Sequence, residues 1–85
     1  MSDLLINIYC PSISKSYDFW IPGSLKAGSV IEQVCDAICE IENNKSIFIN
    51  RETLLLCSYM RQDVLQNDIT LDYAGIRSGD RLAVV

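Results

Sequence analysis

Cysteine has the most reactive side chain in this chain, which contains Cys10, Cys35, Cys39 and Cys57. Cys35 and Cys39 are spaced like half of a metal site, but the chain has no histidine, and the other two thiols fall in separate apolar segments. The 85-residue chain has enough other core-forming residues to fold without disulfides. We therefore expect free thiols that are buried or at the core boundary, with a metal or redox site and a structural disulfide as the alternatives.

Three acidic residues form a second pattern that could have a function. Glu32, Asp36 and Glu40 recur every four residues, so on a helix they share one face with no Lys or Arg between them. Like charges at this spacing cost about 0.2–0.5 kcal/mol per pair, and Glu40 lies towards the negative end of the helix dipole. This acidic stripe is either a solvated face that tolerates the cost or a docking site for a basic partner.

Residue types needed for catalytic and cofactor sites are missing. Without histidine the chain lacks the usual acid or base at neutral pH, and its isolated glycines form no phosphate loop. We expect no enzymatic activity, no cofactor and no metal. A net charge of -4 argues against nucleic-acid binding, and no apolar run approaches the roughly 18 residues of a membrane span. The start Met1-Ser2-Asp3 lacks the basic residues of a signal peptide, so we expect a cytoplasmic protein.

Hydrophobic periodicity predicts the elements in the first half of the chain. Residues 4–10 and 17–21 alternate at period two and predict a hairpin. A helix is predicted at about residues 29–44. Ser29 and Glu32 form a capping box at its start, and Asn43-Asn44 suits its end. Its buried arc is expected to contain Ala37, Val30, Ile41, Val34, Ile38, Ile31 and Cys35, with Cys39 at the margin.

The second half of the chain has shorter elements. Three short strands are predicted, at residues 47–49, 54–57 and 81–85. Residues 58–70 read as irregular, and a short helical turn at about 71–74 is closed by Gly75. The predicted fold class is α+β, with one amphipathic helix across one face of a five-stranded mixed sheet, in a single domain of residues 1–85.

The closing sequence TLDYAGIRSGDRLAVV resembles the short helical turn, Leu-x-x-x-Gly-Ile and last strand of ubiquitin-like proteins. Its pattern Gly75-Ile76-x-x-Gly79-Asp80-x-Leu82 is similar to that of the YukD/EsaB-like group, small bacterial ubiquitin-like proteins associated with type VII secretion. The resemblance implies a β-grasp fold in which the last strand lies in the middle of the sheet, parallel to the first. It also implies an accessory or regulatory protein that binds protein components of the secretion machinery.

The resemblance leaves three alternatives. In some members of the wider group the domain is the N-terminal part of a multi-span membrane protein, and an unrelated ubiquitin-like adaptor would share the fold. Ubiquitin and the sulfur carriers extend past the last strand to a mobile Gly-Gly, whereas this sequence closes on Val84-Val85, which are β-branched and stiff. We therefore expect a complete, non-conjugated small protein, with a covalent modifier or sulfur carrier as the less favoured alternative.

Apolar residues of the sheet are further candidates for partner binding. Ubiquitin binds most partners through the outer face of its sheet, where the matching positions here are Phe48, Ala83 and Val85. An exposed Phe48 beside Val85 would form a modest apolar patch, unless the twist of the sheet or residues 58–70 cover it. Trp20 would be exposed on an edge strand, which would allow a weak homodimer.

Overall fold

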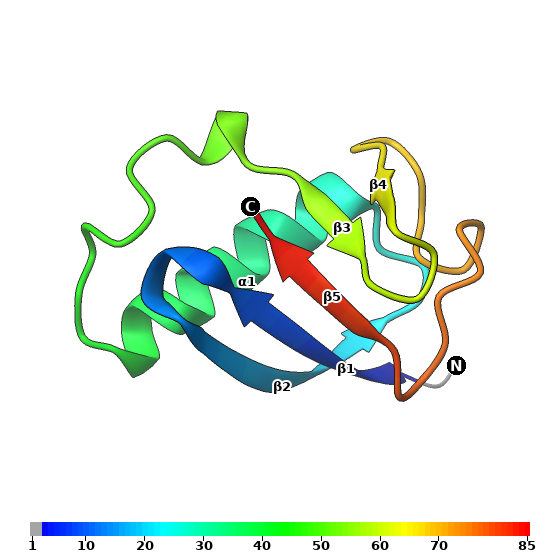
Figure 1. The fold of residues 1–85 in the computed structure, drawn as a ribbon, viewed down its shortest axis with the longest axis horizontal. Helices are drawn as coiled ribbons and strands as arrows, with labels where there is room; N and C mark the ends of the chain where they lie inside the picture. Colours follow the sequence, from blue (N-terminus) through cyan, green and yellow to red (C-terminus); the bar gives the residue numbers. More distant parts are fainter. Residues whose placement is uncertain (1–2) are drawn as a thin grey trace.

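One long helix lies across one face of a five-stranded sheet (Figure 1). The computed structural model describes residues 3–85, so Met1 and Ser2 lie outside it. The elements in chain order are β1 (Asp3–Cys10), the 3-10 turn η1 (Pro11–Ile13), β2 (Lys15–Pro22), α1 (Ala27–Ile41), the 3-10 turn η2 (Arg51–Thr53), β3 (Leu56–Ser58), β4 (Asp63–Leu65) and β5 (Arg81–Val84). The α+β fold class is therefore confirmed.

The strand order of the sheet is β2-β1-β5-β3-β4. Strand β5 runs parallel to β1 on one side and antiparallel to β3 on the other, as the red strand in Figure 1 shows. The pairing continues past β5, because Val85 and Leu55 exchange backbone hydrogen bonds of 2.9 and 2.8 Å. The expectation that the last strand is central and parallel to the first is confirmed.

The core lies between α1 and the inner face of the sheet. Alternate side chains of β1 and β5 face the helix, including Ile6, Ile8 and Leu82, which have no exposed surface. The helix buries the stripe Ala27, Val30, Ile31, Val34, Cys35, Ile38 and Cys39. The predicted arc is wrong at Ile41, the last residue of α1, which is 59% exposed. Angular position identifies the apolar face of a helix, but it does not tell how far the packed layer beneath extends.

The start of α1 is not a capping box. The helix begins at Ala27 after Lys26, which makes no side-chain capping hydrogen bond, and Ser29 is already inside the first turn. The free N–H groups of the first turn are satisfied from a distant segment. The N–H of Ala27 donates to Ile69 O over 2.9 Å, and that of Gly28 to Asn67 O over 3.0 Å.

The end of α1 agrees better with the prediction from the sequence than its start does. Asn43 has a φ of 52°, in the left-handed region, and the N–H of Asn44 donates to Cys39 O over 3.0 Å.

No helix in the described part of the chain has both the length and the apolar character that a membrane crossing requires.

One predicted strand is absent, and one strand of the sheet was not predicted. Residues 47–49 form a loop, in which Phe48 alone is buried. The fifth strand is instead β4, within the stretch 58–70 that the sequence predicts to be irregular. Phe48 anchors its loop in the core without a neighbouring strand, whereas β4 gains its hydrogen bonds from β3.

The short turn near residues 71–74 is present. The N–H of Ala74 donates to Thr70 O over 3.1 Å, and Gly75 closes the turn with a φ of 79°. A side chain is strained in that conformation, which explains the glycine. The turn places Leu71 and Ile76 in the core and leads the chain back to the start of β5.

Candidate protein-interaction surface

The cysteines are free, and three of them are buried. Cys10, Cys35 and Cys39 belong to the core, while Cys57 is partly exposed on β3. Burial raises the pKa of Cys10 to about 11 and that of Cys35 to about 12, so both thiols are protonated and unreactive at neutral pH. Within residues 3–85, no three His, Cys, Asp or Glu side chains are grouped so that they could hold a metal ion. The expectation of free thiols in or near the core is confirmed.

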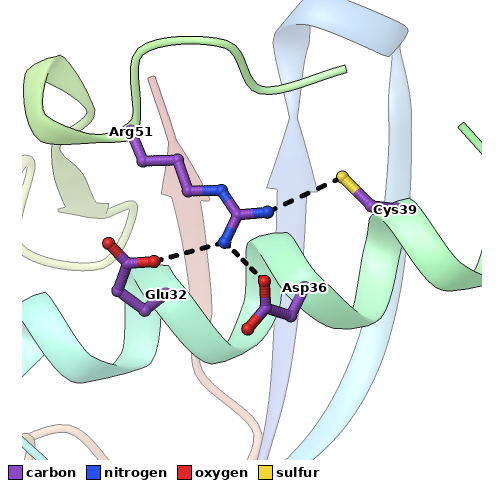
Figure 2. Close-up of polar contacts among 4 residues, drawn as sticks. All are labelled: Glu32, Asp36, Cys39 and Arg51. Carbon is purple, nitrogen blue, oxygen red and sulfur yellow. Dashed lines mark hydrogen bonds and ion pairs between the residues drawn. The ribbon is translucent and has the colours of Figure 1, made fainter. Parts of the chain in front are cut away.

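The acidic stripe on α1 is partly neutralised by the chain itself. Arg51, from η2, reaches over the helix in Figure 2 and pairs with Glu32 and Asp36, at N–O distances of 3.2 and 2.5 Å. Its other terminal nitrogen lies 4.0 Å from Cys39 Sγ. Asp36 and, to a lesser degree, Glu32 raise the pKa of the Arg51 guanidinium above its usual range. The part of the stripe that could receive a basic partner is therefore already occupied, apart from Glu40.

A second group of polar side chains joins the end of α1 to β2. Glu42 accepts a hydrogen bond from the Tyr17 hydroxyl and forms a 2.9 Å ion pair with Lys15. The Tyr17 hydroxyl and then Lys15 hold the pKa of the Glu42 carboxyl below its usual value. Together with Arg51, these contacts fasten both ends of the loop that connects α1 to β3.

Alternation along β5 divides its side chains between the two faces of the sheet. Leu82 and Val84 are in the core, so Arg81, Ala83 and Val85 lie on the outer face, opposite the helix. Ala83 is paired across the sheet with Tyr9 of β1 and Cys57 of β3. A small side chain in the central strand, between larger neighbours, leaves a depression.

This depression is a shallow hollow of about 380 Å³ over β3, β4 and β5. The hollow is lined by Cys57, Ser58, Tyr59, Gln62, Asp63, Val64, Ala83 and Val85. Its rim exposes three large apolar or aromatic side chains, since Tyr59 is 48%, Val64 45% and Val85 49% exposed. A contiguous group of this kind on a sheet face is typical of a protein-binding site.

The structure brings together part of the predicted binding residues. Ala83 and Val85 both line the hollow. The exposed position proposed for Phe48 is wrong, because this side chain is 8% exposed and belongs to the core. Residues 47–49 form a loop in which Phe48 lies in the core, Ile47 is partly buried against it and Ile49 is exposed.

Trp20 lies apart from the hollow, near the other edge of the sheet. Strand β2 is an edge strand, and Trp20 is 67% exposed, while the adjacent Phe19 is packed against the core. The predicted exposure of Trp20 is confirmed. Its cross-strand partner on β1 is Leu5, which is 36% exposed.

Several residues of the outer face were missed from the sequence. Arg81 lies over the rings of both Tyr9 and Tyr59, and Val64 comes from β4, the strand that was not predicted. The period-two pattern of β1 places Tyr9 on the face opposite Ile8, which is a usable signal. Its proximity to Arg81 depends on strand order, which no local pattern contains.

Comparison with known proteins bears on the fold. No protein-family model matches the sequence, and no curated protein matches it. The chain superposes on the N-terminal ubiquitin-like domain of the 4931431F19Rik protein with a TM-score of 0.75 and 15% identity, covering 99% of this chain and 74% of that one. The chain has the ubiquitin-like β-grasp fold.

Two further ubiquitin-like structures show the same likeness. Caldiarchaeum subterraneum ubiquitin matches with a TM-score of 0.71 and 17% identity, over 96% of this chain and 90% of that one. The UBL domain of Plasmodium falciparum Dsk2 matches with a TM-score of 0.73 and 12% identity, over 98% and 96%. Identities this low establish the ubiquitin-like fold and leave the function to the surface of this chain.

Proposed function

We propose that this chain is a non-enzymatic, non-conjugated ubiquitin-like domain that binds another protein through the hollow on its outer sheet face. The observation that carries the proposal is the hollow itself, with Tyr59, Val64 and Val85 exposed around Ala83. Three strands joined by backbone hydrogen bonds hold these side chains in place, so a partner would meet a preformed surface.

The size of the hollow favours a weak and reversible interaction. Burial of apolar surface contributes about 25 cal/mol per Å², so three half-exposed side chains supply a few kcal/mol at most. Interfaces at the small end of the observed range belong mainly to transient encounters. Binding of this kind suits an accessory or regulatory protein.

We assign the partner to the machinery of a type VII secretion system, with this domain as an accessory or regulatory protein in the cytoplasm. The support is the resemblance of Gly75-Ile76-x-x-Gly79-Asp80-x-Leu82 to the YukD/EsaB-like group. Both glycines have positive φ, and Ile76 and Leu82 are buried, so these residues also serve the fold. The secretion assignment therefore needs a test separate from that of the binding face.

Both parts can be tested by affinity purification from the native host. We would compare tagged wild type with Val64→Glu, which places a charge in the hollow, and with Ile49→Glu as the matched control. Ile49 is an 81% exposed β-branched residue that does not line the hollow. Secretion components should co-purify with wild type and Ile49→Glu and be lost with Val64→Glu.

Each contrary result removes a defined part of the proposal. If Val64→Glu releases a specific partner that is unrelated to secretion, the domain is an adaptor with the same binding face. If Val64→Glu retains every partner, the hollow is not the binding site. A mass increase on incubation with ATP and an activating enzyme would make the protein a covalent modifier or sulfur carrier.

A further inference from the structure

Arg81 lies between two tyrosines on the outer sheet face. Strand β5 has β1 on one side and β3 on the other, so Tyr9 and Tyr59 flank the Arg81 side chain. The guanidinium carbon is 5.3 Å from the centroid of the Tyr9 ring and 5.2 Å from that of Tyr59. Both distances are within the roughly 6 Å over which a cation is attracted to an aromatic ring. Tyr59 is also held by its backbone N–H, which donates to Arg81 O over 3.1 Å.

The Arg81 guanidinium has no acidic partner among residues 3–85. Within residues 3–85, the ion pairs engage Lys15 and Arg51, and no side-chain hydrogen bond involves Arg81. In this part of the chain its N–H groups donate to no protein oxygen, and the side chain is exposed, so these donors are accessible to a ligand. A planar guanidinium held in one position, with its donors free, matches the two oxygens of a carboxylate.

The position of Arg81 links it to the hollow. Arg81 and Ala83 occupy successive outer positions of β5, which are about 7 Å apart on a strand. Tyr59 belongs to both features, because its ring contacts Arg81 and the residue is part of the lining of the hollow. Neighbouring side chains on one face of a helix are separated by about 5–6 Å. One side chain of a bound helix could therefore occupy the hollow while its neighbour contacts Arg81.

We propose that the outer face recognises a protein segment in which an Asp or Glu lies beside a large apolar side chain. The apolar side chain fills the hollow over Ala83, and the carboxylate accepts hydrogen bonds from Arg81. This inference rests on the proposed function, since it names the chemistry of the partner at the same face.

The surrounding charges favour a carboxylate over a phosphate group or nucleic acid. Asp63 lines the hollow and would repel a dianion more strongly than a singly charged group. The chain as a whole carries a net charge of -4, which opposes a polyanion, whereas one local guanidinium suffices for one carboxylate. Arg81 would also repel a basic segment, so the binding face prefers a negatively charged segment to a positively charged one.

The test begins with a random peptide library displayed on phage and selected against the immobilised domain. Wild type should enrich peptides with an Asp or Glu beside Leu, Ile, Met or Phe. Arg81→Met should enrich the apolar residues without the acid, because the hollow remains. Val64→Glu should enrich neither class. Arg81 is exposed, so its variants should fold, and circular dichroism checks that they do.

The affinity of one enriched peptide then measures the role of the guanidinium. Removing a charge-assisted hydrogen bond at a partly exposed site should weaken binding about tenfold. Arg81→Met and an acid-to-amide change in the peptide should each have this effect, and together they should cost little more than one alone. Arg81→Lys should bind less tightly than wild type, because an ammonium does not present a planar fork. Arg77→Met, an exposed control with the same charge change, should bind like wild type.

The outcomes separate the two proposals. Apolar peptides without acidic enrichment that are lost with Val64→Glu would overturn the role of Arg81 and leave the binding face intact. Enrichment that is unaffected by Val64→Glu, or no enrichment by wild type, would overturn both. Full affinity in Arg81→Met would overturn the carboxylate contact, and full affinity in Arg81→Lys would overturn the need for a stacked guanidinium.

Discussion

Replacing Arg51 with methionine should destabilise the domain by about 1–2 kcal/mol. Methionine keeps a long, unbranched side chain and removes the charge that joins η2 to α1. The Glu32 and Asp36 side chains are 61% and 70% exposed, and ion pairs between exposed groups contribute about 0.2–1 kcal/mol each. Loss of Arg51 also leaves Glu32 and Asp36 as like charges four residues apart, which costs about 0.2–0.5 kcal/mol more.

The effect can be measured by urea and thermal unfolding followed by circular dichroism. In a domain of this size, 1 kcal/mol corresponds to about 4–8 °C in Tm. The difference between Arg51→Met and wild type should shrink in 1 M NaCl, where charges are screened beyond about 3 Å. Asp36→Asn and Arg51→Met should be less than additive, because they remove the same pair. Arg77→Met is the matched control, and its effect should stay within about 0.5 kcal/mol.

Two results would refute this account of the acidic stripe. The first is an Arg51→Met variant that unfolds at the same urea concentration as Arg77→Met. The second is full additivity with Asp36→Asn at both salt concentrations. Either would mean that Arg51 does not neutralise the stripe, and Glu32, Asp36 and Glu40 would again be a candidate docking face for a basic partner.

Two further predictions concern buried side chains. Phe48→Ala should lower the free energy of unfolding by about 3 kcal/mol, because it removes a core aromatic ring, and a loss below 1 kcal/mol in urea unfolding would place Phe48 on the surface. In the unfolded chain the thiols of Cys10 and Cys35 ionise around their ordinary pKa of 9.0, whereas burial raises their pKa in the folded chain to about 11 and about 12. The stability that these thiols contribute is therefore complete well below pH 9 and should fall as the pH rises through 9. The fall should be shallower in Cys35→Ala by up to about 1.4 kcal/mol per pH unit, and an equal slope in urea titrations at pH 8 to 10.5 would contradict the raised pKa.

Period-two alternation was sufficient to predict the strands that have regular pairing. Strands β1 and β2 pair along their whole length, and β5 alternates Leu82 and Val84 inwards with Ala83 outwards. Alternation wrongly predicted a strand around Phe48, where one buried ring anchors a loop without a neighbouring strand. Alternation also missed β4, whose three residues are too few to show a period.

The sequence mispredicts a helix boundary where the hydrogen-bond partners of that boundary are distant in sequence. The pair Ser29 and Glu32 has the spacing of a capping box, yet the first turn of α1 obtains its acceptors from Ile69 and Asn67. The end of the helix was predictable because Asn43 acts locally, through its own left-handed conformation. Local signals are therefore reliable for the ends of elements that are satisfied locally.

The same distinction applies to the charged side chains of the surface. On the sequence, the acidic stripe had no basic neighbour at helical spacing, but Arg51 reaches it from η2, after the connecting loop has folded back. Conversely, Arg81 has no aromatic neighbour in the sequence, and acquires two through the order β1-β5-β3. Tertiary contacts thus neutralise Glu32 and Asp36 on the helix and, as far as residues 3–85 show, hold a guanidinium without an acidic partner on the sheet.

The proposed docking face of this acidic protein thus carries a positive charge, that of Arg81, beside the hollow. If binding were governed by net charge, this chain would select basic partners, whereas a contact at Arg81 selects a carboxylate despite the long-range repulsion. Screening by salt weakens that repulsion over the whole molecule, but a direct hydrogen-bonded contact is screened much less. Acidic peptides should therefore bind with an affinity that changes little, or rises, between low and physiological salt, whereas a steep fall would show that screened Coulomb attraction, and not a direct hydrogen-bonded contact with Arg81, holds the acidic peptide.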